Sequence, residues 1–397
     1  MTLIKRNLSI FLILPYFMAV TGMLILDSGD KKIIPFIILA AISSIYLYKN
    51  EQVSKNIKSP FILLLSLLCA YTIFSYYYHG SSSREIRALL GSTLFLIIFP
   101  HHLLTRGVIQ WVILLGSIFV FINSIYFNLY IGIERNAGYI NPIPYATTCA
   151  LLSIIAFSLL LDSSTLKEKF FSAMAFLLSI PPIILSETRG VWLALTFSIF
   201  VIIFIKCIKN PPSRKKIFFT FVFTAILTSS GSIFFNDQIS QRYYSTAYEI
   251  KKIQANDYNT SFGLRLQMWM LAPELIVEKP IFGHGNGQAR ILSKKLKNGD
   301  ISHLLFSFAS HHYHNQFLDK MVKSGVVGLI FMFGLLFYPL KMIKKSPPFE
   351  QYMIIGLVSL FLIAGLTDVP FNHSQPMMLY LLFLAPICSR CKRVSND

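Results

Sequence analysis

Charged residues are scarce in this sequence. Only 14% of its 397 residues are charged, whereas 54% are hydrophobic and 14% are aromatic. A soluble protein carries about 25% charged residues, and a mean hydropathy of +0.59 leaves too little polar surface for a water-soluble domain. The composition therefore excludes an ordinary soluble enzyme as well as a disordered chain, and it favours a polytopic membrane protein.

Acidic residues are half as frequent as basic ones. The chain has 36 Lys and Arg residues against 18 Asp and Glu residues, which gives a formal net charge of +18. On a soluble domain this excess would favour nucleic-acid binding. In a membrane protein, basic residues on the cytoplasmic side set the orientation and contact anionic lipids. We therefore expect membrane lipids, and no nucleic acid, among the partners.

Cysteine is rare too. The five cysteines lie within or at the ends of apolar runs, so no disulfide framework is visible. Cys388 and Cys391 form a single CxxC pair, whereas a structural zinc site needs four ligands. We expect these cysteines to lie at a membrane edge without a metal.

Long apolar runs are abundant. They predict about twelve transmembrane helices, although some runs fall near or below the lower length limit of roughly 17 residues, and Pro181-Pro182 should interrupt one of them. The runs cover residues 8–26, 33–48, 61–78, 88–104, 108–131, 145–161, 170–186, 191–208, 217–236, 323–340, 351–370 and 377–389. The expected fold class is an all-α polytopic membrane protein.

The basic residues between these runs predict the orientation. With the amino terminus inside, most basic residues of the short loops fall on the cytoplasmic side, and both termini are cytoplasmic. Residues 237–322 then form one large outer loop. The predicted organisation is residues 1–236 with transmembrane helices 1–9, residues 237–322 as a periplasmic loop with amphipathic helices, and residues 323–397 with transmembrane helices 10–12.

The outer loop contains two notable stretches. Residues 263–278 place apolar side chains at helical spacing, which predicts an amphipathic helix that Pro273 kinks or splits. Residues 310–315 hold three of the nine histidines, but they lack the usual metal-ligand pattern. If residues 314–340 form one helix, His314 and Gly325 share a face, and Gly325 and Gly328 allow close packing of another helix.

Three arginines are predicted at the outer membrane edge together with His314. Arg135, Arg189 and Arg265 could be held by Glu134, by Glu187 and by solvent, respectively. Alternatively, they could bind an anionic lipid head group, because arginine pairs with phosphate oxygens in a bidentate manner. Neighbouring cations would keep His314 neutral near pH 7, so that it could take a proton from an attacking hydroxyl.

These motifs resemble those of the bacterial O-antigen ligases, within a group that also includes O-antigen polymerases and protein O-oligosaccharyltransferases. The resemblance rests on His314-Asn315 followed by Gly325 and Gly328, on the turn at residues 187–190 and on the stretch 265–287. The order of these motifs within the predicted topology matches across nearly the whole chain. The resemblance implies a GT-C-like membrane fold.

The resemblance further implies a function. The enzyme would transfer O-antigen polysaccharide from undecaprenyl diphosphate to the lipid A–core oligosaccharide, at the periplasmic face of the bacterial inner membrane, without a cofactor or metal. His314 would activate the acceptor hydroxyl with inversion at the anomeric carbon, and Arg189 and Arg265, with Arg135 as a further candidate, would hold the diphosphate. Asn315 would orient the histidine or cap its helix.

Other functions remain open from the sequence. An O-antigen polymerase would use the same donor with another lipid-linked glycan as acceptor, and a protein O-oligosaccharyltransferase would use a protein hydroxyl. A lipid-linked glycan transporter would place ionisable residues near the middle of the membrane, whereas the clearest charges here lie at the predicted outer edge.

Overall fold

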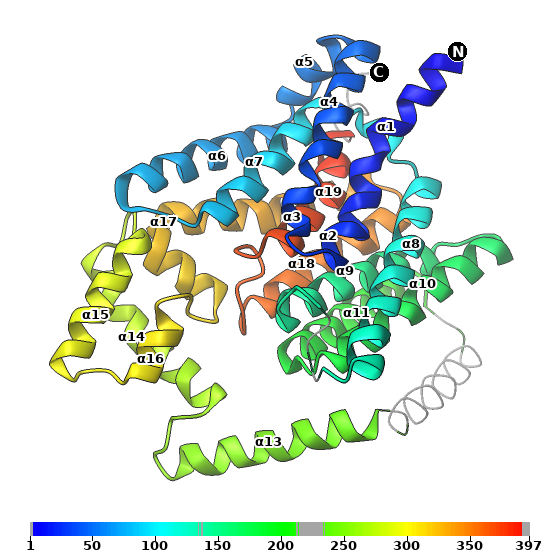
Figure 1. Ribbon diagram of the computed structural model, residues 1–397. Helices are drawn as coiled ribbons and strands as arrows, with labels where there is room; N and C mark the ends of the chain where they lie inside the picture. The colour runs from blue at the N-terminus through cyan, green and yellow to red at the C-terminus, as the bar shows by residue number, and fades with distance from the viewer. Residues whose placement is uncertain are drawn as a thin grey trace.

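The computed structural model describes residues 3–390 except 134, 136, 137, 212, 214–232 and 234. All regular secondary structure in these residues is helical (Figure 1). The helices are α1 (Leu3–Val20), α2 (Gly22–Ile25), α3 (Gly29–Lys32), α4 (Ile34–Tyr48), α5 (Glu51–Ile57), α6 (Pro60–His79), α7 (Ser83–Ile98), η1 (His101–Leu103), α8 (Arg106–Ile125), η2 (Tyr126–Tyr130), α9 (Pro142–Leu161), α10 (Leu166–Leu185), α11 (Arg189–Lys209), α13 (Asn236–Gln254), α14 (Ser261–Glu278), η3 (Gly285–Gly287), α15 (Gln288–Asn298), α16 (His303–Ala309), α17 (Gln316–Phe337), η4 (Tyr338–Lys345), α18 (Pro348–Ala364) and α19 (Ser374–Arg390).

Within the described residues, seven helical segments are long and apolar enough to cross a membrane. They are Gly29–Tyr48, Pro60–His79, Arg106–Tyr130, Pro142–Leu161, Leu166–Leu185, Arg189–Lys209 and Gln316–Lys345, and two shorter apolar helices cover Ile10–Ile25 and Pro348–Ala364. The predicted class of all-helical protein with several membrane spans is thus confirmed, whereas the count of about twelve stays a prediction. The predicted run 217–236 lies almost wholly outside the described residues.

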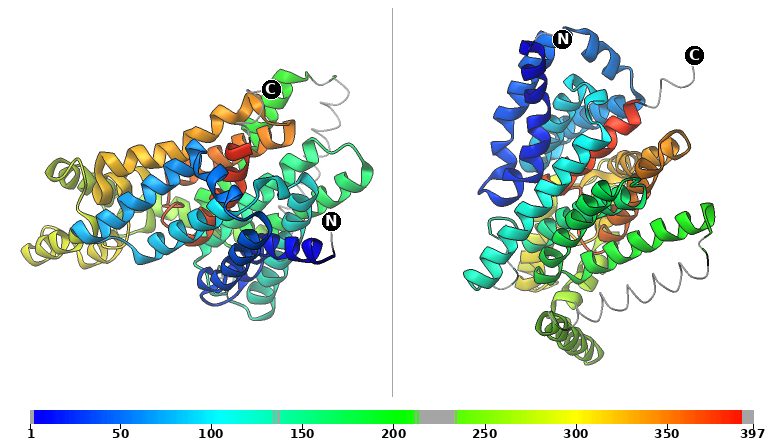
Figure 2. Two further views of the ribbon diagram at one scale, coloured as in Figure 1. Left: turned by 90° about the horizontal axis from the view of Figure 1, so that it is seen from above. Right: turned by 90° about the vertical axis from the view of Figure 1, so that its right-hand side faces the viewer.

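Helix α9 forms the centre of the bundle. It packs against α8, α10, α11, α18 and α19, and almost all of its side chains are buried. Figure 2 shows the helices of the bundle from two further directions. Pro181 and Pro182 lie inside α10, which continues through them to Leu185, so the expected interruption is wrong.

Helices α13 to α16 lie beside the bundle, where the sequence predicts the outer loop (Figure 1). Helix α14 covers the stretch predicted to be helical, and a separate apolar core forms between Leu264, Met268, Ala272 and Leu275 and residues of α15 to α17. Its other face also exposes apolar side chains, those of Met270 and Val277, so its amphipathic character stays a prediction. Helix α14 continues through Pro273 and ends at Glu278, so the expected split at this proline does not occur. A helix can accommodate the lost backbone hydrogen bond when one of its faces is packed.

Helix α17 is interrupted at Gly325, contrary to the expectation of one continuous helix from residue 314. Gly325 has φ 60° and ψ −164°, a conformation that only glycine adopts readily. The interruption exposes backbone groups that the linker after α14 satisfies: Val326 N–H donates to Pro280 O (2.8 Å), and His284 N–H donates to Val322 O (2.8 Å). A Cβ atom on Gly325 would lie 2.2 Å from Ile281 O.

The two glycines of the motif therefore have different neighbours. Gly325 admits the backbone of the α14–α15 linker rather than another helix. Gly328 lies against α6, with Tyr71 Cε1 3.8 Å from the position of a Cβ atom. The Tyr71 hydroxyl donates to Ser324 O at 2.6 Å, so close helix packing at Gly328 agrees with the expectation for a small residue in a membrane bundle.

Candidate active site

Four arginines surround one cavity at the end of the bundle that faces α13 and α14. Arg135, Arg189, Arg242 and Arg265 line a space of about 110 Å³ together with three carboxylates, those of Glu187, Glu249 and Asp368. Four positive and three negative charges leave a net positive site. The structure thus brings together the three arginines that the sequence singled out.

Two of these arginines already have carboxylate partners. Arg189 begins α11 and contacts Glu249 of α13 at 3.0 Å, and it also donates to Thr246 Oγ1 at 2.6 Å. Arg242, on the same helix α13, contacts Glu187 at 2.7 Å. The alternative in which Glu187 holds Arg189 is therefore wrong, because the two side chains pair with different partners on α13.

The other two arginines have no carboxylate within 4.0 Å among the described residues. Arg265 projects from α14. Burial lowers the pKa of its guanidinium, Asp368 raises this pKa and Arg189 lowers it, and the net shift is downward. Loss of surrounding water, followed by repulsion from Arg242, lowers the pKa of Arg135. The expected partner of Arg135, Glu134, lies outside the described residues. An anion at Arg265 and Arg135 would relieve this uncompensated charge.

His314 lies in the loop between α16 and α17 and not in a helix. Its φ of 47° is left-handed, and the next residue, Asn315, caps α17 by accepting hydrogen bonds from Phe317 N–H (3.0 Å) and Leu318 N–H (3.2 Å). Capping by Asn315 is one of the two expected roles. The tight turn and the cap together fix where the imidazole of His314 points.

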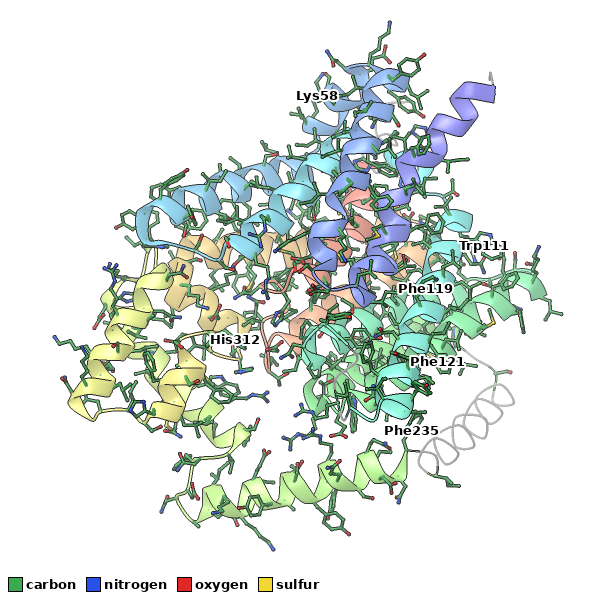
Figure 3. The ribbon with its side chains drawn as sticks, in the orientation of Figure 1. Lys58, Trp111, Phe119, Phe121, Phe235 and His312 are labelled. Carbon is green, nitrogen blue, oxygen red and sulfur yellow. The ribbon has the colours of Figure 1, made fainter. Side chains whose placement is uncertain are left out.

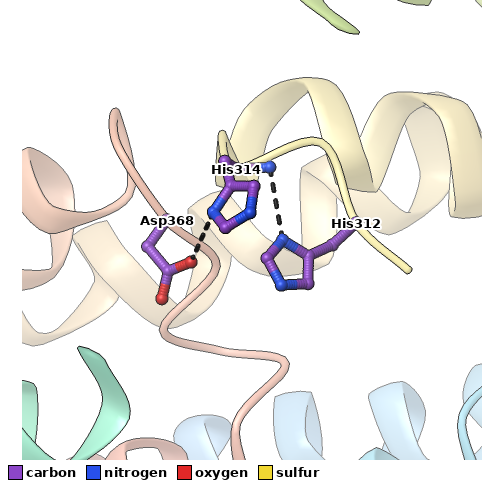
Figure 4. A group of neighbouring side chains, drawn as sticks. All are labelled: His312, His314 and Asp368. Atoms are coloured by element: carbon purple, nitrogen blue, oxygen red, sulfur yellow. Dashed lines mark hydrogen bonds and ion pairs between the residues drawn. The ribbon is translucent and has the colours of Figure 1, made fainter. Parts of the chain in front are cut away.

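Asp368 lies beside the His314 ring (Figure 4). His314 Nδ1 lies 3.3 Å from Asp368 Oδ1, without the alignment of a hydrogen bond, while His373 Nε2 lies 3.1 Å from Asp368 Oδ2. Burial alone raises the pKa of the Asp368 carboxyl, but the neighbouring His373 and His314 lower it, and the net shift is downward. Asp368 is therefore an ionised, buried carboxylate beside the imidazole.

His312 completes the histidine cluster. Its ring centroid is 4.1 Å from that of His314, and its Nδ1 accepts the His314 backbone N–H at 3.3 Å. Figure 3 shows His312 where the α16–α17 loop faces the bundle. Burial, followed by repulsion from His314, lowers the pKa of His312 to about 3. This imidazole is therefore neutral at physiological pH.

His312, His314 and Asp368 are also within reach of a single metal ion. Each offers one ligand atom, and these atoms lie within 4.8 Å of one another. Two imidazoles and a carboxylate suit several divalent ions. The sequence points instead to a metal-free site, and that expectation stays a prediction, which the chelation experiment below tests.

The histidine and the arginines meet at a common cavity. A space of about 420 Å³ is lined by Arg135, Arg265 and His314, and also by Asn141 and Phe308. Arg189 lines the adjoining arginine cavity, which shares Arg135 and Arg265 with it. The ring that could accept a proton and the cations that could hold an anion therefore share one space.

Sequence reasoning missed three members of this site. Arg242 and Asp368 were not among the residues predicted for the site, and His312 was noted only as part of the histidine-rich stretch 310–315. The spacing of Asp368 and His373 just after an apolar run was the available signal, because charge at a membrane edge usually has a partner. Nothing in the local sequence indicates that α13 reaches the turn before α11.

Comparison with known proteins identifies the family group. Residues 174–333 match the family model described as O-Antigen ligase, a segment that contains Arg189, Arg242, Arg265, His314 and the two glycines of the motif. This part of the chain is therefore similar to the O-antigen ligase family, and the resemblance predicted from the sequence is confirmed.

Three relatives extend this comparison. An uncharacterized protein of Haemophilus influenzae is 29% identical over 324 residues, which is 77% of this chain and 78% of that protein. A Rickettsia conorii protein described as "Putative polysaccharide ligase RC0486" is 26% identical over 53% of this chain, and a Rickettsia felis protein described as "Putative polysaccharide ligase" is 29% identical over 53%. The matches span about half the length of the two Rickettsia proteins, 51% and 52%.

Proposed function

We propose that this protein is a membrane glycosyltransferase of the O-antigen ligase type. It transfers O-antigen polysaccharide from undecaprenyl diphosphate to the lipid A–core oligosaccharide, with the reaction site at the periplasmic face of the bacterial inner membrane and both termini in the cytoplasm. The single observation that supports this most is the shared cavity, where His314 faces the same space as Arg135 and Arg265. The family match and the described relatives support an enzyme that acts on polysaccharide.

The arginine cavity would hold the donor diphosphate. Arg265 and Arg135 have no carboxylate partner among the described residues and would bind phosphate oxygens directly. Arg189 would bind once a phosphate competes with Glu249 for its guanidinium. Guanidinium groups around the diphosphate stabilise the negative charge that grows on it as it leaves, which lowers the barrier to transfer.

His314 would act as the general base. The acceptor hydroxyl oxygen attacks the anomeric carbon of the donor sugar, the bond from that carbon to the phosphate oxygen breaks, and its electron pair leaves with the diphosphate. The hydroxyl proton passes to His314 Nε2, the ring nitrogen that does not face Asp368. A direct displacement of this kind inverts the anomeric configuration. Asp368 would stabilise the imidazolium that forms and hold the ring in the tautomer with a free Nε2.

A reconstituted assay tests this function. Purified full-length protein is mixed with lipid-linked O-antigen and rough lipopolysaccharide, and ligated lipopolysaccharide is measured on gels. We expect His314→Ala and Arg265→Ala to abolish transfer while the proteins still purify as folded membrane proteins. Activity that EDTA abolishes and a divalent ion restores would contradict the metal-free mechanism and assign His312, His314 and Asp368 to a metal site.

A gene deletion distinguishes the ligase from the polymerase. If the protein is the ligase, its loss removes long-chain lipopolysaccharide while lipid-linked polymer persists. Loss of the polymer itself, with single-unit caps remaining on the core, would identify a polymerase and overturn the proposal.

A further inference from the structure

A second, larger cavity adjoins the cavity of Arg135 and Arg265, and the two share Asn141, Phe308 and His314. It has a volume of about 700 Å³, within the usual range for ligand sites, and it shares His314 with the cavity of Arg135 and Arg265, and Asp368 with the arginine cavity. The α2–α3 turn, the start of α7, the loop before α9 and the α18–α19 loop form its other walls. A group bound here would lie next to the imidazole and next to the space proposed for the diphosphate.

Two arginines at the start of α7 line this cavity without acidic partners. Arg84 and Arg87 lie three residues apart on one face of the helix, and both are exposed. Arg87 donates one long hydrogen bond to Ser83 Oγ (3.4 Å), and neither guanidinium has a carboxylate within 4.0 Å among the described residues. The nearest acid in sequence, Glu85, pairs instead with Lys320 of α17.

Other residues that line the cavity offer groups of a different kind. Asp27, Asp30, Asn141 and Gln375 line the same cavity, and Asp30 Oδ2 accepts a hydrogen bond from Ser374 Oγ at 3.2 Å. Carboxylates and amides suit sugar hydroxyls, whereas a pair of guanidinium groups suits a phosphate or a carboxylate. The cavity thus contains groups suited to sugar hydroxyls and groups suited to an anion, together with the proposed base His314.

We propose that this cavity holds the acceptor oligosaccharide, and that Arg84 and Arg87 select an acceptor with an anionic substituent near the attacking hydroxyl. This inference rests on the proposed function, because it assigns the second substrate of the same reaction. The two arginines are specificity determinants that contact the acceptor, and they take no part in the proton transfer.

The test measures the KM for the acceptor in the reconstituted full-length protein. The double variant Arg84→Gln/Arg87→Gln is compared with wild type and with Arg290→Gln, a matched change at an exposed arginine on α15 that lines neither cavity. We expect the acceptor KM of the double variant to rise roughly 10- to 100-fold, as for the loss of one or two charge-assisted hydrogen bonds. The donor KM and the kcat at saturating acceptor should stay within twofold of wild type.

The acceptor itself provides the second arm. Rough lipopolysaccharide is used as isolated, after removal of phosphate with hydrofluoric acid, and after reduction of its carboxylates. The treatment after which wild type and the double variant have the same acceptor KM identifies the anionic group. Three outcomes would each overturn the inference. The double variant could behave like Arg290→Gln, its raised acceptor KM could persist on acceptor that lacks both groups, or the rise could be confined to the donor KM. Absence of transfer in the wild-type protein would instead end the proposed function, before any variant is compared.

Discussion

Replacement of Asp368 by asparagine is expected to slow transfer far more than it weakens substrate binding. The carboxylate lies 3.3 Å from His314 Nδ1 and 3.1 Å from His373 Nε2, and its side chain is only 6% exposed. An asparagine amide keeps the shape of the side chain but removes the charge that stabilises an imidazolium, and its N–H₂ group favours the wrong tautomer of His314.

The size of this effect follows from the geometry. Loss of an aligned carboxylate beside a catalytic histidine costs about 10⁴-fold in kcat in a serine protease. The contact here is longer and not aligned in the absence of substrate, so we expect a loss of roughly 100- to 1,000-fold in kcat, equivalent to about 2.7–4 kcal/mol. The donor KM should not rise, because the variant leaves the arginine cavity more positive.

Single-turnover and steady-state assays on the reconstituted protein measure this loss. Asp300→Asn, a change at an exposed acid at the end of α15, provides the control for folding and insertion. In a His314→Ala background the Asp368→Asn change should have little further effect, because residues that act as a unit are not additive. A kcat within twofold of wild type, or an undiminished effect without His314, would refute the positioning role of Asp368.

Three further results are expected. Glu249→Gln should free Arg189 for the donor and lower the donor KM by about 2- to 5-fold, as for the loss of one partly exposed ion pair, and a raised KM in a donor titration would contradict this. Gly325→Ala should lower the free energy of unfolding by about 2–4 kcal/mol, since its Cβ atom would meet a carbonyl oxygen at 2.2 Å; Gly107→Ala, with open space around it, should be near neutral in the same thermal melts. The pKa of His312 is lowered to about 3, so between pH 6.5 and 3 the unfolded chain binds a proton that the folded protein does not. Stability therefore falls as pH falls, by up to about 1.4 kcal/mol per pH unit. His312→Gln should flatten the decline of Tm between pH 6 and pH 4, and an unchanged slope would show that His312 is not the group responsible.

The class of fold was predictable because the signals for it are local. Every predicted apolar run within the described residues falls wholly or mostly on a helix, since twenty or so apolar residues without charge can satisfy their backbone in a membrane only as a helix. The amphipathic spacing of Leu264, Met268 and Leu275 likewise predicts α14 correctly. The prolines in α10 and α14 misled the prediction, because tertiary packing outweighs the lost hydrogen bonds.

The site was predictable only in part. Residue type and membrane-edge position identify Arg135, Arg189, Arg265 and His314, and the structure brings them to adjoining cavities. The pairing of these groups depends on contacts between segments far apart in sequence, such as α13 with the turn before α11, and no local pattern specifies such contacts. The conformation of His314 was missed for a related reason: the helix starts two residues later because Asn315 caps it.

Two ion pairs, Arg189–Glu249 and Arg242–Glu187, join α13 to the turn before α11 and to its first residue, and they have a consequence for product release. Under the proposed function, Glu249 is in place to recombine with Arg189 when the diphosphate product leaves, so the vacated guanidinium would not have to wait for an ion from solution. Such an internal counterion would lower the energetic cost of releasing a highly charged product.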